Sequence, residues 1–204
     1  MPILYIHGMG GGGDSRIPSI LREEGLDVIV RTYDFDPDVA SAQISSWVME
    51  LNPELVIGES LGSLHALTIQ GIPKVLVSPA LNAPIYFELL AWLTLIPGVT
   101  ALFNRIYRPR EGDRQPLRFT FRTLRKYMPH RRAALTLSAS SSDRVFALLG
   151  SRDHYRKSGI VSFKTWKKYF GDACFVYDGS HFTEEEYVRT DLKRIVLEML
   201  DNNK

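Results

Sequence analysis

The segment Gly58-Glu59-Ser60-Leu61-Gly62 places a serine at the centre of a Gly-x-Ser-x-Gly pattern. The pattern directly follows the apolar run 55–57 and precedes a helix-length segment, which is the context of a nucleophile elbow. In such an elbow a sharp strand-to-helix turn strains the serine backbone, and flanking glycines avoid the clash that side chains would cause. Ser60 is therefore predicted to be a nucleophile, and the simpler alternative is a hydroxyl that only caps the helix.

A serine hydroxyl becomes a strong nucleophile when a base accepts its proton, and the base is commonly a histidine oriented by a carboxylate. Asp153 follows the apolar run 145–149, and His181 follows the run 174–177. The chain order Ser, Asp, His is the order found with this type of elbow. The sequence therefore predicts a catalytic triad of Ser60, Asp153 and His181.

Other residues could fill the same roles. His154 is an alternative base, although the side chains of neighbouring residues such as 153 and 154 tend to diverge. His65 is expected to be a packing or surface residue, and His130 a surface residue. Asp172 and Asp178 are rival carboxylates, but each adjoins the last apolar run rather than following its neighbour.

A glycine-rich loop, His7-Gly8-Met9-Gly10-Gly11-Gly12-Gly13, follows the first apolar run. Acyl transfer develops negative charge on the carbonyl oxygen, and fixed backbone N–H groups stabilise that charge. One N–H is expected from Leu61, the residue after the nucleophile, and the other from Met9 in this loop. His7 is expected to brace the loop rather than to transfer protons.

The same loop also matches the dinucleotide-binding fingerprint through Gly8, Gly10 and Gly13. Asp34 lies about 20 residues further on, where an acidic residue would bind ribose. On this alternative the protein would be an oxidoreductase. The match is weak because a run of glycines satisfies the spacing easily, and it leaves the predicted triad unexplained.

Bringing these residues together requires a sheet. Six short apolar runs recur between helix-length segments, at 3–6, 28–30, 55–57, 75–77, 145–149 and 174–177. Most do not alternate with polar residues, which is typical of parallel strands buried on both faces. Helices are expected near 14–25, 38–51, 61–71, 155–170 and 184–201, the last with a capping box at Thr183 and Glu186. We therefore predict an α/β fold, a three-layer sandwich with a mostly parallel sheet of about six strands.

The alternation stops between about 84 and 140, so the 204 residues are predicted to form a single domain with a helical cap or lid inserted there. Residues 85–103 are strongly apolar, but Glu88 and a Pro-Gly pair interrupt them, and no membrane span is predicted. Residues 105–132 contain ten Arg or Lys against two acids, a local charge of +8 where the whole chain has +2. These charges form either a solvated face or a surface that attracts anions.

Composition excludes several classes of protein. The single cysteine, Cys174, rules out an intrachain disulfide framework and a cysteine-built zinc site. A hydrophobic fraction of 45% and a charged fraction of 24% are ordinary globular values and argue against disorder. The small net charge favours no particular partner, and no nucleic-acid partner is predicted. The N-terminus has no secretory pattern, so a cytoplasmic location is expected.

These motifs together resemble the α/β-hydrolase superfamily, and more closely small bacterial esterases of the YqiA type. The resemblance is carried by Tyr5-Ile6-His7-Gly8, the elbow at 58–62, Val77-Ser78-Pro79-Ala80-Leu81 and the loops around positions 153 and 181. It implies an esterase or thioesterase that needs no metal or cofactor and acts on small or medium acyl groups through the triad above. The long cap departs from the family pattern, so substrate choice is not carried over.

The expected function is therefore that of a serine hydrolase cleaving carboxylic ester or thioester bonds of a small-molecule acyl substrate. A peptidase, a non-catalytic binding protein of the same fold and the oxidoreductase remain as alternatives. Phe87, Trp92 and Phe103 in the apolar part of the cap are candidate acyl-pocket residues, and packing of the cap on the sheet is the competing explanation. The oligomeric state is left open.

Overall fold

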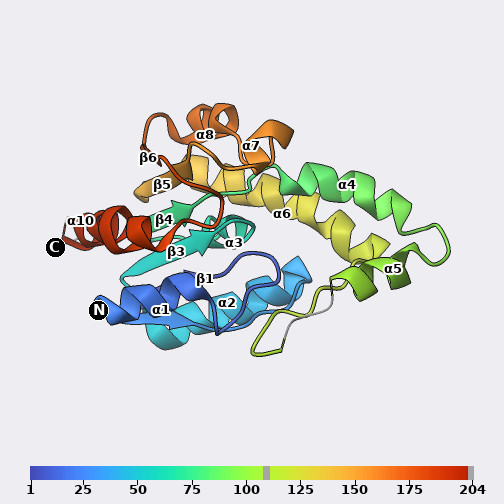
Figure 1. The fold of residues 1–204 in the computed structure, drawn as a ribbon, viewed down its shortest axis with the longest axis horizontal. Coiled ribbons are helices and arrows are strands. Elements are labelled where there is room, and N and C mark those ends of the chain that lie inside the picture. The colour runs from blue at the N-terminus through green and yellow to red at the C-terminus, as the bar shows by residue number, and fades with distance from the viewer. Residues whose placement is uncertain (108–110, 202–204) are drawn as a thin grey trace.

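Helices cover both faces of one six-stranded sheet in the computed structural model, which describes residues 1–107 and 111–201 (Figure 1). The strands are β1 (Ile3–Ile6), β2 (Val28–Val30), β3 (Leu55–Glu59), β4 (Lys74–Val77), β5 (Val145–Gly150) and β6 (Cys174–Tyr177). Their order is β2-β1-β3-β4-β5-β6, and every neighbouring pair is parallel. All six predicted strands and the predicted fold class are confirmed.

The helices expected near 14–25, 38–51 and 184–201 are present close to those positions, and the one expected near 155–170 is divided in two after residue 158, where Gly159 adopts a left-handed conformation. The helical segments are α1 (Arg16–Glu23), α2 (Pro37–Leu51), α3 (Gly62–Ala66), α4 (Ala83–Leu93), α5 (Val99–Ile106), α6 (Phe121–Ser140), α7 (Tyr155–Ser158), α8 (Phe163–Phe170), α9 (Glu185–Tyr187), the π-helical η1 (Val188–Leu192) and α10 (Lys193–Asp201). α3 is shorter than predicted, because the Thr68 hydroxyl donates to the His65 carbonyl and competes with the helix. The predicted capping box is wrong, since Glu184 precedes α9 and Thr183 adopts a φ of 46°.

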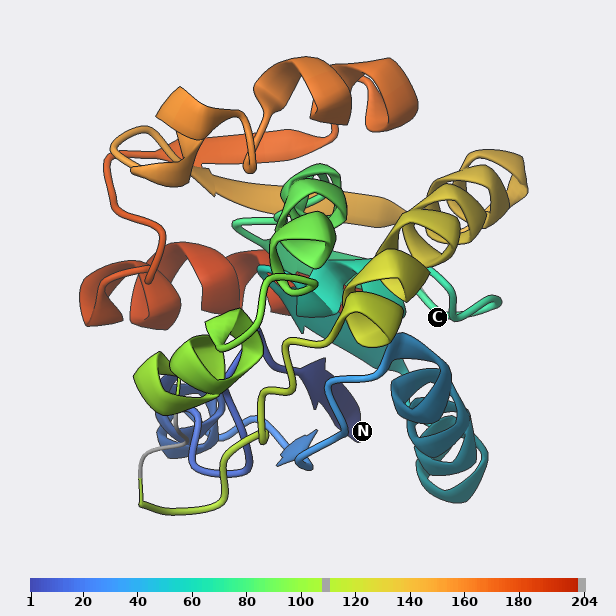
Figure 2. The same cartoon turned by 90° about the vertical axis from the view of Figure 1, so that its right-hand side faces the viewer.

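Alternating strand side chains build a core on each face of the sheet. Leu4, Val56 and Leu76 pack on one face with residues of α2, α3, α4, α6 and α8. Ile3 and Ile57 pack on the other face with residues of α1, η1 and α10. Figure 2 shows α1 and α10 to the left of the sheet and α2 and α6 to its right. The result is the three-layer sandwich that the apolar runs predict.

Strand order fixes where a site can form. The chain passes from β1 to the edge strand β2 and returns on the other side of β1 as β3, so the order reverses between β1 and β3. In open parallel sheets the crevice beyond the carboxyl ends at such a reversal is where ligands bind. His7 follows β1, Ser60 follows β3, and Ile6 pairs in register with Gly58. The topology therefore brings the glycine-rich loop and the elbow to the same edge.

The segment predicted as a cap contains α4, α5 and α6, and these helices differ in burial. In α6, Leu124 and Tyr127 belong to the same buried cluster as Val56 of the sheet, so this helix is part of the main core. α5, by contrast, has no buried residue. Arg108 and Arg110 of the predicted basic segment lie outside the described residues. No helix in the described ranges is both long and apolar enough to cross a membrane.

Three histidine rings lie in the core between the glycine-rich loop and α6. His7 stacks on Tyr33 with ring centroids 4.2 Å apart, and His65 lies 5.2 Å from Tyr33 and 4.5 Å from His130. Neither ring nitrogen of His65 has a hydrogen-bond partner among the described residues, and the same holds for Nε2 of His7 and of His130. His130 was expected at the surface, but its ring turns inward against His65.

These rings make stability depend on pH. Burial lowers the pKa of His7 and of His130 to about 4, and it lowers the pKa of His65 well below the ordinary value. The unfolded chain binds protons at these positions below a pH of about 6.5 while the folded chain does not, so stability is lost as the pH falls from about 6.5 towards 4. Between pH 7.5 and 5 the free energy of unfolding should fall by about 2 kcal/mol for each of His7 and His130. Burial of His65 lowers its pKa in the same direction and so adds to this loss.

Guanidinium denaturation at constant ionic strength measures this loss. His65→Leu is the informative variant, because it removes one buried titrating ring and keeps an apolar side chain of similar size. Its stability should fall less steeply over the same pH range than that of the unchanged protein. Identical pH dependence in the two proteins would contradict the account.

Candidate active site

Ser60 occupies the turn between β3 and α3. Its φ is 49°, in the left-handed region that non-glycine residues seldom adopt. The Ser60 N–H donates to the Val77 carbonyl at 2.9 Å, and the Ser60 carbonyl accepts from the Ala80 N–H at 3.1 Å. These bonds to the end of β4 hold the strained turn in place, as in the elbow that the sequence predicts.

The glycines of the elbow allow backbones to meet. A Cβ atom on Gly62 would lie 2.3 Å from the His7 carbonyl oxygen and 2.4 Å from that of Ile6. A Cβ atom on Gly58 would lie 2.8 Å from the Cβ atom of Ala66. Because the atoms facing Gly62 are backbone atoms of β1 and its loop, they cannot give way without displacing the strand.

Gly62→Ala should therefore lower the free energy of unfolding by about 3 kcal/mol or more. Gly71→Ala is a matched control, because Gly71 has a φ of 78° but open space where its Cβ atom would lie. This control should cost only about 1 kcal/mol. Chemical denaturation of both variants checks the prediction, and equal losses would show that close approach at residue 62 is unimportant.

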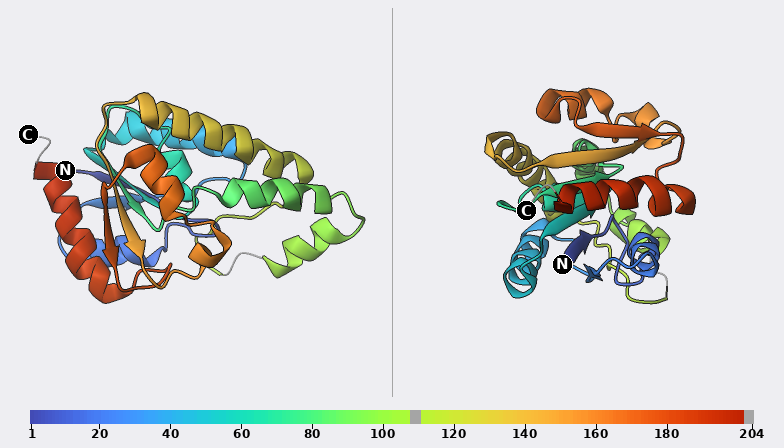
Figure 3. Two further views of the ribbon diagram at one scale, coloured as in Figure 1. Left: turned by 90° about the horizontal axis from the view of Figure 1, so that it is seen from above. Right: turned by 90° about the vertical axis from the view of Figure 1, so that its left-hand side faces the viewer.

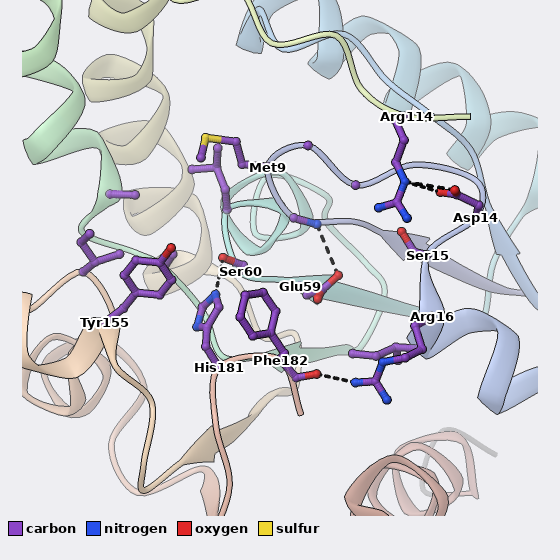
Figure 4. A pocket seen from close by; sticks show the side chains of 18 of the residues that line it. Met9, Asp14, Ser15, Arg16, Glu59, Ser60, Arg114, Tyr155, His181 and Phe182 are labelled. Atoms are coloured by element: carbon purple, nitrogen blue, oxygen red, sulfur yellow. Dashed lines mark hydrogen bonds and ion pairs between the residues drawn. The ribbon is translucent and has the colours of Figure 1, made fainter. Parts of the chain in front are cut away.

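Ser60, His181 and Asp153 form a continuous hydrogen-bonded row. His181 Nε2 lies 2.9 Å from Ser60 Oγ, and His181 Nδ1 lies 2.7 Å from Asp153 Oδ2. Figure 4 shows the His181 ring pointing at the Ser60 hydroxyl. A carboxylate only accepts hydrogen bonds, so Nδ1 carries the ring proton and Nε2 can accept one from the serine. The structure thus brings together the three residues predicted as a triad.

Backbone contacts between two loops bring the acid and the histidine together. The Ser151 N–H donates to the Tyr177 carbonyl at 2.8 Å, and the Arg152 N–H donates to the Gly179 carbonyl at 2.9 Å. A Cβ atom on Gly150 would lie 2.4 Å from the Gly179 oxygen, so this approach also depends on a glycine. Asp153 and His181 are then buried side by side, with 3% and 6% of their surface exposed.

The rival residues lie elsewhere. His154 is exposed, and its ring centroid is 5.8 Å from that of His181. Asp178 is exposed and pairs with Arg152, and Asp172 pairs with Lys167. None of these three rivals is hydrogen-bonded to Ser60 or His181 in the described part of the chain.

The glycine-rich loop leaves one backbone donor, the Met9 N–H, without a partner among the described residues. His7 Nδ1 donates to the Gly8 carbonyl at 2.8 Å, and the Gly11 N–H donates to the same oxygen at 3.0 Å. In a trans peptide the next N–H, that of Met9, points away from these two donors. Neither the Met9 nor the Leu61 N–H donates a hydrogen bond within residues 1–107 and 111–201. Both residues line the cavity that Ser60 also lines, so this cavity has two backbone donors in its wall that could serve an oxyanion.

Ser60 and His181 open onto a cavity of about 370 Å³. One part of its wall is apolar and includes Ala80, Ala83, Phe87 and Ile160. Asp14, Arg16, Glu59 and Arg114 also line the cavity, on the side of Ser60 away from Tyr155 (Figure 4). The site can therefore receive a substrate with an apolar group on one side of the hydroxyl and a polar group on the other.

Of the three predicted acyl-pocket residues, only Phe87 lines this cavity. Trp92 is 55% exposed and packs edge-on against Phe121. It lies five positions after Phe87, about 140° further round the helix, so the two rings point to different sides of α4. Phe103, on α5, packs against Phe119, with 5.9 Å between the ring centroids. The structure does not bring Trp92 or Phe103 to the cavity.

Sequence reasoning missed the charged wall. The Tyr5 hydroxyl donates to Glu59 Oε2 at 2.8 Å, and burial together with this carboxylate raises the pKa of Tyr5. Arg16 donates to the carbonyl oxygens of Phe182 and Thr183, which directly follow His181 and so help to fix its loop. No short motif marks these residues, because they meet only when the loops after β1, β3 and β6 converge.

The dinucleotide alternative finds no support in the loop geometry. A Cβ atom on Gly12 would lie 1.7 Å from the Asp113 carbonyl oxygen, and one on Gly13 would lie 2.2 Å from Asp113 Oδ2. Asp113 thus fills the space where a pyrophosphate would have to bind, and its carboxylate would repel one. Within the described residues, no cluster of three or more His, Cys, Asp or Glu side chains is arranged to hold a metal ion.

Comparisons with known proteins agree on the fold. No family model matches the chain, and no curated protein matches its sequence. A monoacylglycerol lipase from Paleococcus ferrophilus superposes with a TM-score of 0.64 at 17% identity, covering 100% of this chain and 95% of that one. NosK from Streptomyces actuosus superposes with a TM-score of 0.63 at 16% identity, covering 99% of this chain and 98% of NosK. A structure from a study of carboxylesterases of Nitrososphaera gargenis superposes with a TM-score of 0.52 at 16% identity, covering 99% of this chain and 90% of that one. The chain has the α/β-hydrolase fold.

Proposed function

We propose that this protein is a serine hydrolase that cleaves carboxylic ester or thioester bonds of small to medium acyl substrates. The observation that carries the proposal is the row from Asp153 through His181 to Ser60, with contacts of 2.7 and 2.9 Å. The Met9 and Leu61 N–H groups support it, because both residues line the cavity and neither N–H donates a hydrogen bond within the described residues. Structural neighbours described as a lipase and as carboxylesterases add support at the level of the fold.

The proposed reaction has two halves. Ser60 Oγ attacks the carbonyl carbon while its proton passes to His181 Nε2, and the N–H groups of Met9 and Leu61 stabilise the resulting oxyanion. Collapse of this intermediate breaks the bond to the alcohol or thiol, which takes the proton from Nε2. Water then attacks the acyl-serine with the same proton transfers, releasing the acid and restoring the hydroxyl. Throughout, the Asp153 carboxylate holds the ring and stabilises its charged form.

The cavity sets the expected substrate size. A volume of about 370 Å³ lies at the lower end of the range for small-molecule sites. The apolar wall around Phe87 suits an acyl chain, and the wall with Arg16 and Glu59 suits a polar leaving group. We further propose that α4 and α5 act as the cap of a single domain, with Phe87 of α4 contributing to the pocket wall.

Turnover of matched substrates tests the proposal. p-Nitrophenyl acetate, butyrate, octanoate and palmitate, a butyryl thioester and an amino-acid p-nitroanilide should be compared. Ester or thioester turnover is expected, with the highest kcat/KM at butyrate or octanoate. Turnover of the anilide alone would favour a peptidase. Absence of any turnover, together with no labelling by a fluorophosphonate, would favour a non-catalytic binding protein.

A further inference from the structure

A surface on α4, α5 and their connecting turn exposes large apolar side chains. We call it the α4–α5 apolar surface and define it by Leu89, Trp92, Leu95, Ile96, Leu102 and Ile106, each between 53% and 66% exposed. Figures 1 and 3 show this turn projecting from the end of the molecule. Soluble proteins seldom expose apolar side chains in such a group without a binding partner.

Four of these residues lie on the two helices and two lie in the turn between them. Leu89 and Trp92 are three positions apart on α4, and Leu102 and Ile106 are four apart on α5, so each pair lies on one side of its helix, while Leu95 and Ile96 belong to the turn. α5 has eight residues and none is buried. A helix this short has little stability of its own in water, and its apolar side gains stability only when something covers it.

Positive charge borders the surface. The sequence contains no Asp or Glu between Glu88 and Glu111, and in the described residues Glu88 is paired with Arg125. Arg105, Arg118 and Arg122 are exposed, and none of them forms an ion pair with a carboxylate in the described part of the chain.

Ring contacts of the neighbouring residues place the backbone of two of these arginines close to α4 and α5. Phe121 packs against Trp92 with ring centroids 5.3 Å apart, which places the adjacent Arg122 near α4. Phe119 packs 5.9 Å from Phe103 of α5, which places the adjacent Arg118 near that helix. The border of the surface is therefore cationic.

We propose that the α4–α5 apolar surface docks on an anionic lipid bilayer. The arginines would contact anionic headgroups, and the apolar side chains would enter the boundary between headgroups and acyl chains without crossing the bilayer. Charge favours this occupant over a second copy of the chain, because a two-fold contact through the same surface would bring the same arginines together. Docking does not require that the protein hydrolyse esters, and α4, which carries Phe87 in the cavity wall, would then face the lipid.

Vesicle co-sedimentation tests the proposal separately from turnover, because it uses protein carrying Ser60→Ala. Vesicles of phosphatidylcholine alone are compared with vesicles containing about 30% phosphatidylglycerol at about 0.1 M salt. Partitioning onto the anionic vesicles should be about tenfold stronger and should weaken as salt increases. Leu95→Asp with Ile96→Asp, and separately Arg118→Glu with Arg122→Glu, should each reduce it about tenfold.

Matched controls remove comparable groups elsewhere. Met49→Asp changes a 79% exposed apolar residue of α2, and Arg132→Glu with Lys164→Glu changes two exposed cations of α6 and α8. These controls should bind vesicles like the parent protein, and thermal melting should show that all variants are folded. The proposal is overturned by absence of binding to anionic vesicles or by an equal loss in the controls. It is also overturned if, without vesicle binding, the protein self-associates and Leu95→Asp with Ile96→Asp abolishes that association.

Discussion

Replacing Ser60 with alanine is expected to lower kcat for p-nitrophenyl butyrate by about 10⁴-fold or more. The variant keeps the oxyanion donors and the pocket but lacks the atom that attacks the carbonyl. Stability should change little, because the Ser60 backbone rather than its side chain makes the bonds to β4. Steady-state kinetics and denaturation of the same preparation measure both effects.

Ser63→Ala is the matched control for this variant. Ser63 lies three residues away in α3, is fully buried, and donates its hydroxyl to the Gly58 carbonyl at 3.0 Å. Losing this bond should cost about 1–2 kcal/mol of stability and leave kcat near that of the parent protein. Persistent turnover by Ser60→Ala, confirmed free of contaminating esterase, would place the nucleophile elsewhere.

Asp153→Asn should lower kcat by about 10³- to 10⁴-fold without unfolding the protein. Asp153 Oδ1 accepts the Tyr155 N–H at 2.8 Å while Oδ2 faces His181 Nδ1. In the variant the amide oxygen must take the position opposite the Tyr155 N–H, so the NH₂ group faces Nδ1. The ring proton then moves to Nε2, and the imidazole offers Ser60 a donor instead of a base.

Asp178→Asn separates this effect from a general loss of charge. Asp178 lies at the end of β6, and its carboxylate accepts from Ser151 and pairs with Arg152 at the surface. Its amide variant should keep a kcat close to that of the parent protein. If the two asparagine variants were equally active, Asp153 would not be the residue that orients the histidine.

Much of the framework could be predicted because local pattern determines it. Strands buried on both faces need continuous apolar runs, and β1, β3 and β4 have them. The elbow could be located because Gly62 must lack a side chain where it meets the His7 carbonyl. The placement of positions 153 and 181 followed from strand ends meeting at one edge, which is a property of any parallel sheet.

The rest of the site depends on contacts between distant segments. Nothing adjacent to Asp113 in the sequence indicates that it covers Gly12 and Gly13. The inward positions of the buried His65 and the half-buried His130 could not be predicted either, because histidine is compatible with both surface and core, and only the packing of α6 over α3 decides between them. The position of each side chain around α4 determines which of the predicted residues lines the cavity, since Phe87 does and Trp92 does not.

The central claim is that the row of side chains makes the Ser60 hydroxyl reactive. Incubation of the intact protein with a fluorophosphonate, followed by peptide mapping in a mass spectrometer, tests that claim most directly. We expect one adduct per chain on the peptide that carries Ser60, and a much slower reaction after His181→Ala. An active esterase whose Ser60 does not react with the fluorophosphonate, or an adduct at another residue, would contradict the account.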